Sequence, residues 1–135
     1  MRALLALAAL LVVGPAAAQQ GQISQLPTFN KSILITTGNT FQVISTAGQA
    51  MRSLTIQNNN AGADNCWIEV SGTVTAGMTT SSAVTIPGKP ASTAAKVSIL
   101  LGPGLTYSRY QVHSPTGPIV GTCATTGDSI YVDWQ

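Results

Sequence analysis

The apolar residues of this chain recur at every second position in short runs, and this period constrains the fold more than any other feature. Leu54 and Ile56 alternate with polar residues, and Cys66, Ile68 and Val70 do the same. Successive side chains of a strand point to opposite faces, whereas a helix would need a period of 3.6. The expected strands cover residues 33–37, 41–45, 53–57, 66–71, 97–101, 106–112, 119–123 and 129–134.

Turn-forming residues separate these strands. Gly38-Asn39 joins the first two, and other Gly, Pro, Asn and Ser clusters punctuate the chain. Residues 73–95 are rich in Thr, Ser, Ala and Gly, and we expect them to form a long excursion with one weak strand at 83–86. Outside the N-terminus no stretch has a helical stripe. The pattern predicts a single all-β domain over residues 19–135, an antiparallel β-sandwich or jelly roll.

The first 18 residues have the layout of a secretory signal peptide. Arg2 precedes the apolar run 3–13, Gly14-Pro15 breaks any helix, and Ala16 and Ala18 occupy the small-residue positions before Gln19. The apolar run is much shorter than the roughly 20 residues that span a bilayer. We therefore expect cleavage before Gln19, export through the Sec pathway to the periplasm or the outside, and no membrane span in the mature form.

The chain has two cysteines, Cys66 and Cys123. In an exported protein an even number of cysteines indicates a disulfide, and closing this long loop would stabilise the fold by roughly 4 kcal/mol. The alternatives are a reactive thiol or a metal ligand, but neither cysteine has a second Cys or a His at ligand spacing. Alternation places Cys66, Ile68 and Val70 inward, and therefore places Trp67 and Glu69 outward.

Charged residues are sparse, and this excludes one class of partner. The expected mature chain carries five cations and four carboxylates: Lys31, Arg52, Lys89, Lys96, Arg109, Asp64, Glu69, Asp128 and Asp133. Such a balance supplies no basic stripe for phosphates, so nucleic-acid binding is disfavoured. The abundance of Thr, Ser, Val and Ile is typical of half-buried strands rather than of disorder.

No pattern in the chain predicts an enzyme, a cofactor or a metal centre. The sequence Gly127-Asp-Ser-Ile130 is similar to a block of GDSL-type esterases, but few residues follow Ser129 and the single histidine, His113, precedes it. A Gly-Asp hairpin turn that leads into the last strand is the better interpretation. A catalytic His113 would need a nucleophile and an orienting carboxylate, so we expect a solvated loop histidine.

The loop from Asn58 to Asn65 is the one polar segment between two clear strands. Its single carboxylate, Asp64, would make a weak calcium site at best, because calcium affinity rises with ligand charge. Asn and Asp also favour turns, since they tolerate left-handed backbone and bond to their own backbone. We expect a connector.

Outward aromatic residues are the remaining functional signal. Ile130, Val132 and Trp134 share one side of the last strand, which leaves Tyr131 on the other. Together with Trp67 and Tyr107, Tyr131 could form a stacking surface for glycans or the centre of a protein interface. Ordinary packing on the second face of the sheet is the alternative.

Several short motifs resemble small all-β modules of tailed-phage and prophage structural proteins. They are Arg52-x-Leu-x-Ile-Gln-Asn58, the strand 67–72 that ends in Gly, the segment 99–104 that enters Pro-Gly, and the closing strand within 121–134. The resemblance covers residues 52–135. It implies a non-catalytic assembly or attachment role and carries over no active-site residue. With the signal sequence, it implies a copy adapted for export or a prophage-derived surface system.

Two functional hypotheses follow. The first is a non-enzymatic exported structural or attachment protein that associates with itself or with other surface or virion proteins. The alternative is a periplasmic or secreted module that binds a glycan or another small ligand through its outward aromatic residues.

The exported protein is expected to have the mass of a chain that starts at Gln19, lowered by about 2 Da for one disulfide. Mass spectrometry before and after reduction checks both the predicted cleavage site and the predicted disulfide. Two thiols that react with an alkylating agent in the native, unreduced protein would contradict the disulfide.

Overall fold

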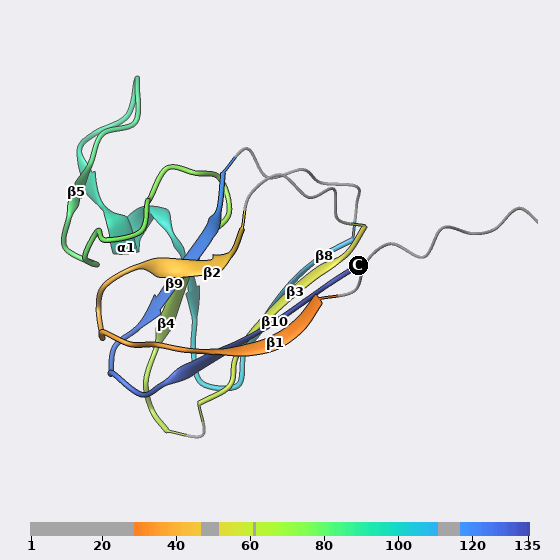
Figure 1. The fold of residues 1–135 in the computed structure, drawn as a ribbon. Coiled ribbons are helices and arrows are strands. Elements are labelled where there is room, and N and C mark those ends of the chain that lie inside the picture. Colours follow the sequence, from red (N-terminus) through yellow and green to blue (C-terminus); the bar gives the residue numbers. More distant parts are fainter. Residues whose placement is uncertain (1–28, 47–51, 61, 111–116) are drawn as a thin grey trace, which may run out of the picture.

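The computed structural model describes residues 29–46, 52–60, 62–110 and 117–135, and eight of its strands form two four-stranded antiparallel sheets (Figure 1). The first sheet has, in spatial order, β1 (Phe29–Leu34), β10 (Ser129–Trp134), β3 (Leu54–Asn58) and β8 (Thr106–Arg109). The second has β2 (Gln42–Ser45), β9 (Ile119–Cys123), β4 (Cys66–Glu69) and β7 (Ile99–Leu101). The predicted all-β sandwich is confirmed.

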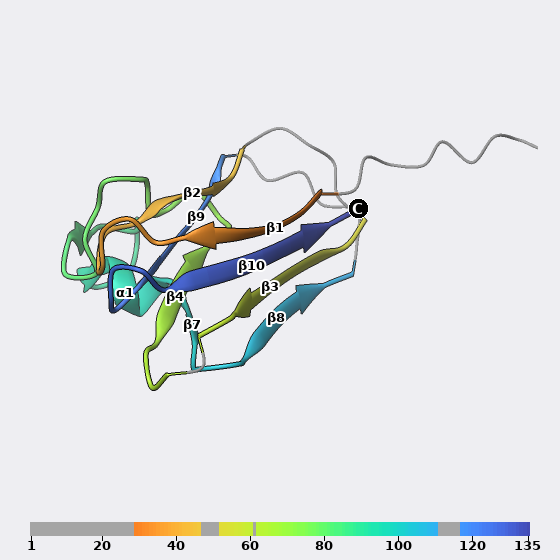
Figure 2. The same cartoon turned by 60° about the horizontal axis from the view of Figure 1, so that its bottom comes forward.

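The path of the chain through these sheets is that of a jelly roll. Each connection between successive strands of the sandwich crosses from one sheet to the other, except the long one between β4 and β7. Figure 2 shows the first sheet in the order β1, β10, β3, β8, with β2 near the β1 side and β7 near the β8 side. This arrangement matches the eight-stranded double-sheet form of the fold.

The core between the sheets follows the alternation of the sequence. Ile56 and Val132 of the first sheet belong to one buried cluster with Ile68 and Cys66 of the second. Removing such a side chain from water contributes about 1.5–3 kcal/mol. Trp134 lies in the same cluster, so the predicted inward faces of β4 and β10 are confirmed.

The outer face of the second sheet is also covered. The segment between β4 and β7 contains a small hairpin of β5 (Ala83–Val84) and β6 (Ser92–Thr93), followed by the one-turn helix α1 (Ala94–Val97). Its residues Val74, Val84 and Ala94 form a second buried cluster with Phe41 and Val120. All five residues of β9 are therefore buried. The sequence had indicated one weak strand here and no helix.

One connection differs from its prediction. Gly127-Asp128 links β9 to β10 across the sandwich and is not a hairpin turn. Gly38-Asn39 joins β1 to β2 as a turn, and these two strands also belong to different sheets. Local turn chemistry was still interpreted correctly, since Asn39 and Gly127 both have positive φ, at 58° and 97°.

Other predictions fall partly or wholly outside the described residues. The predicted signal peptide, residues 1–18, is among these, as are His113 and the end of the predicted strand 106–112. Within the described residues, no helix has the length and apolar character needed to cross a membrane.

The turn at Gly38 lies directly against the turn between β9 and β10. The Gly38 amide donates to Thr126 Oγ1 at 2.9 Å, and the Asn39 amide donates to the Cys123 carbonyl at 2.7 Å. A Cβ atom on Gly38 would come within 2.7 Å of the Ala124 carbonyl oxygen. Backbone atoms cannot move aside as the end of a flexible side chain can, so only glycine fits at position 38 without a shift of the backbone.

Replacing Gly38 by Ala is expected to lower the free energy of unfolding by about 1–3 kcal/mol, because the new methyl group forces two turns apart. The matched control is Gly62→Ala, since a Cβ there would meet nothing within 4 Å. That variant should stay within about 0.5 kcal/mol of the parent. Chemical denaturation of both variants measures the difference, and equal midpoints would contradict the close approach.

Candidate functional site

The three aromatic residues expected to form a surface lie on three different faces. Tyr107 stands opposite Ile56 in the β3–β8 ladder and packs against the main core, so its predicted outward orientation is wrong. Tyr131 stands opposite Gln57, on the outer face of the first sheet. Trp67 lies on the outer face of the second sheet. The structure therefore does not bring these residues together into one stacking surface.

Trp67 points away from the main core, as predicted, but it is half-buried within its own chain. It packs against the second cluster, which includes Phe41, Val74 and Val84. Glu69, on the same face, is buried as well, and its carboxylate accepts a hydrogen bond from the Ser71 amide. The segment between β4 and β7 provides this cover, so contacts within the chain account for the burial of both side chains.

The polar loop after β3 is built around a buried amide. Asn58 is fully buried, and its Nδ2 donates to the carbonyl oxygens of Asp64 at 2.9 Å and Leu101 at 3.0 Å. Its Oδ1 accepts hydrogen bonds from the backbone and the side-chain nitrogen of Asn60, at 3.1 and 2.8 Å. A buried amide with all of its groups paired holds the loop in one conformation.

Asn60 extends this network to the disulfide. Cys66 and Cys123 lie directly opposite each other on neighbouring strands of the second sheet and form the predicted bridge, with a Cα–Cα distance of 3.9 Å. The Nδ2 of Asn60 lies 3.4 Å from the Cys66 sulfur and 3.7 Å from the Cys123 sulfur. Its Oδ1 accepts from the Ser129 amide at 2.9 Å. We call Asn58, Asn60 and the disulfide the end cluster.

The end cluster supports the interpretation of residues 58–65 as a connector. Its amide groups are engaged with protein atoms, and they tie the first sheet to the second at the point where β3 ends and β10 begins. The alternation of Leu54 and Ile56 could have indicated that Asn58 also points inward. Three consecutive Asn residues obscured that signal, because they favour a solvated turn.

The described residues show no metal centre. None of their His, Cys, Asp and Glu side chains gather in groups of three or more. Ser129, the serine of the esterase-like block, begins β10, and its amide is engaged by Asn60.

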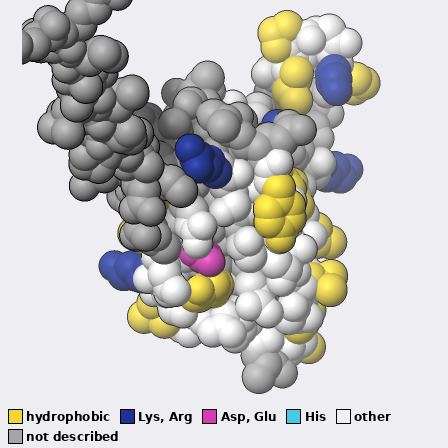
Figure 3. Space-filling view, turned by 90° about the vertical axis from the view of Figure 1, so that its right-hand side faces the viewer, with side chains coloured by type: hydrophobic (Ala, Val, Ile, Leu, Met, Phe, Trp, Pro, Cys, Tyr) yellow, Lys and Arg dark blue, Asp and Glu magenta, His cyan; other side chains and the backbone are white. Residues whose placement is uncertain are grey.

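Among the residues that the structure describes, five large apolar side chains are exposed, and they lie at two opposite edges of the sandwich. Their exposed fractions range from 44% to 75%, and they are Leu34, Val43, Leu100, Leu105 and Tyr110. Only residues 102–105 connect β7 to β8, so these two strands must lie at the same edge. Figure 3 shows hydrophobic side chains exposed on one face of the molecule among mostly uncharged groups.

We call the two regions the β1/β2 edge, with Leu34 and Val43, and the β7/β8 edge, with Leu100, Leu105 and Tyr110. Sequence patterning did not reveal either one, because exposure at an edge depends on strand order.

Replacing Asn58 by Ala is expected to lower the free energy of unfolding by about 2–4 kcal/mol, because the buried Leu101 carbonyl oxygen and the partly buried Asp64 carbonyl oxygen lose their donor. Asn59→Ala is the matched control, since the Asn59 side chain is exposed, and we expect a change below about 0.5 kcal/mol. Thermal and chemical denaturation under oxidising conditions measure both variants. Similar stability of the two would contradict the structural role of the end cluster.

Comparison with known proteins supplies no relative for this chain. No family model, no curated protein and no solved structure matches it. The resemblance to phage and prophage modules therefore rests on the short motifs of the sequence, and the function is inferred from the chain's own surfaces and contacts.

Proposed function

We propose that the protein is a non-enzymatic, exported structural or attachment module that assembles with copies of itself. The observation that carries this proposal is the placement of exposed apolar side chains at two opposite edges of the sandwich. Single exposed apolar residues are normal on protein surfaces. Here Leu100, Leu105 and Tyr110 fall within eleven residues of chain at one edge.

Two different apolar edges favour head-to-tail assembly. An interface related by a two-fold axis uses one patch on both partners, whereas a head-to-tail interface joins two different patches and closes into a ring or extends into a filament. The β1/β2 edge of one copy would meet the β7/β8 edge of the next. Burying a Leu side chain in such a contact contributes about 1.5–3 kcal/mol.

Charges at the edge strands direct this contact to the second sheet. Lys31 of β1 stands opposite the buried Val132, and Arg109 of β8 stands opposite the buried Leu54. Both edge strands of the first sheet therefore carry a cation on the core-facing side, an arrangement that opposes pairing between edges. The edge strands of the second sheet, β2 and β7, contain no charged residue.

The export part of the proposal rests on the signal sequence and on the disulfide. Structural disulfides persist in oxidising compartments and are rare in the cytosol. The resemblance to virion accessory modules adds the expectation of a non-catalytic role, with other surface or virion proteins as further partners.

The alternative function, a glycan- or small-ligand-binding module, loses support from the aromatic residues. Trp67 and Tyr131 lie on the outer faces of different sheets, so one small ligand cannot contact both. A glycan or another small ligand would need a binding site that does not combine these two aromatic residues.

The head-to-tail arrangement predicts a specific pattern of assembly. Val43→Glu and Leu100→Glu should each give a monomer in sedimentation equilibrium, because each places a charge in one half of the interface. Mixing the two variants should restore a dimer, since each supplies the edge that the other lacks. The parent protein should show larger oligomers at the same concentration.

Thr125→Glu, in the exposed turn between β9 and β10, is the control for added charge and should assemble like the parent. A monomeric parent protein up to high concentration would contradict the proposal. Dimers of either variant alone would instead indicate a two-fold interface.

A further inference from the structure

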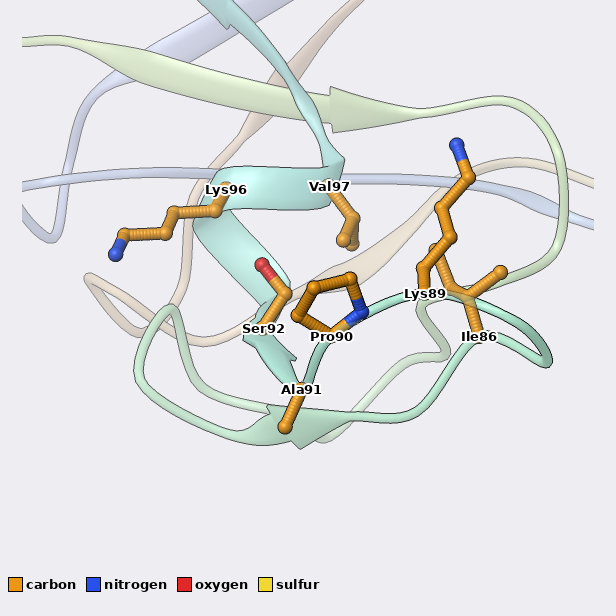
Figure 4. A pocket seen from close by; sticks show the side chains of 7 residues that line it. All are labelled: Ile86, Lys89, Pro90, Ala91, Ser92, Lys96 and Val97. Atoms are coloured by element: carbon orange, nitrogen blue, oxygen red, sulfur yellow. The ribbon is translucent and has the colours of Figure 1, made fainter.

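A hollow of about 500 Å³ lies beside the hairpin that projects from the second sheet (Figure 4). Small-molecule sites in proteins generally have volumes of about 300–1,000 Å³. Its apolar lining includes Ile86, Pro90 and Val97, and its polar lining consists of Ser92, Lys89 and Lys96. Sequence patterning did not indicate a binding or catalytic role for any of these residues.

The walls of the hollow are held by local constraints. Ile86-Pro-Gly-Lys89 forms a tight turn in which the Lys89 amide donates to the Ile86 carbonyl at 3.0 Å and Gly88 has a φ of 76°. This is the pattern of a type II turn with Pro and Gly in its two central positions. On the other side Ser98 Oγ donates to the Ala94 carbonyl at 2.7 Å and closes α1. The site is thus largely formed before any ligand arrives.

The hollow also lies in a segment without negative charge. Between Glu69 and Asp128 the sequence contains no Asp or Glu, whereas Lys89 and Lys96 are both exposed. In Figure 4 their side chains extend to opposite sides of the hollow, with Pro90 and Ser92 between them. Ser92 lines the hollow and is only partly buried, so its hydroxyl can reach a ligand.

We propose that this hollow binds a linear anionic polysaccharide. Two separated ammonium groups suit a chain whose negative groups repeat along its length, because each lysine can reach a different group on a flexible stem. The apolar floor between them suits the C–H face of a sugar ring, and Ser92 can bond to a ring hydroxyl. A compact anion would contact only one of the two lysines. The inference does not depend on self-association.

Titration calorimetry with a carboxylate-bearing oligogalacturonate tests the proposal on the exported protein. Lys89→Gln combined with Lys96→Gln should weaken binding roughly tenfold or more, because both ion pairs are lost. Lys89→Arg combined with Lys96→Arg should retain binding, since the charges remain. Raising the salt concentration from about 50 to about 500 mM should also weaken binding of the parent protein.

Lys31→Gln combined with Arg109→Gln is the matched control, because it removes the same net charge from exposed side chains elsewhere, and it should bind like the parent. A neutral dextran of equal length should not bind. The proposal is overturned by an equal loss in both double Gln variants, by absence of binding to the parent, or by equal affinity for inorganic phosphate or a single-stranded oligonucleotide. Thermal melts verify that each variant is folded.

Discussion

The hydrogen bonds of the buried Asn58 side chain are the interaction on which one end of the sandwich depends, the end where β3 finishes and β10 begins. A buried amide is tolerated only when its donors and acceptor are paired, because desolvation of an unpaired group costs several kcal/mol. Asn58 meets this condition through the Asp64 and Leu101 carbonyl oxygens and through Asn60. The loop conformation, the position of Asn60 over the disulfide and the start of β10 all follow from that pairing.

Coverage of the second sheet on both faces has a different consequence. Because the segment between β4 and β7 packs over its outer face, β9 is buried throughout and Trp67 is half-buried against its own chain. Tyr131 lies on the outer face of the first sheet, and the exposed large apolar side chains of the described residues are found at the edges. The surface open to partners is therefore concentrated at the edge strands and at the projecting hairpin.

The fold by itself does not choose between an assembly module and a binding module. Double-sheet jelly rolls occur in viral capsid proteins, in lectins and in cupins, so function depends on the sites that each fold carries. In this chain the proposed assembly rests on the apolar edges, and the proposed recognition of an anionic chain rests on the hollow at Lys89 and Lys96. The two proposals concern different parts of the molecule and are compatible with each other.

The sequence by itself determined the all-β class, most of the strands, the inward faces of β4 and β10, and the partner of each cysteine. These features follow from the period of two and from the number of cysteines, which are local properties or simple counts. Only the tertiary structure decided that Tyr107 faces the core, that Gly38-Asn39 crosses between sheets, and that Lys89 and Lys96 flank one hollow. Strand order and the path of a long connection depend on contacts between residues far apart in the chain, and periodicity within one strand carries no information about them.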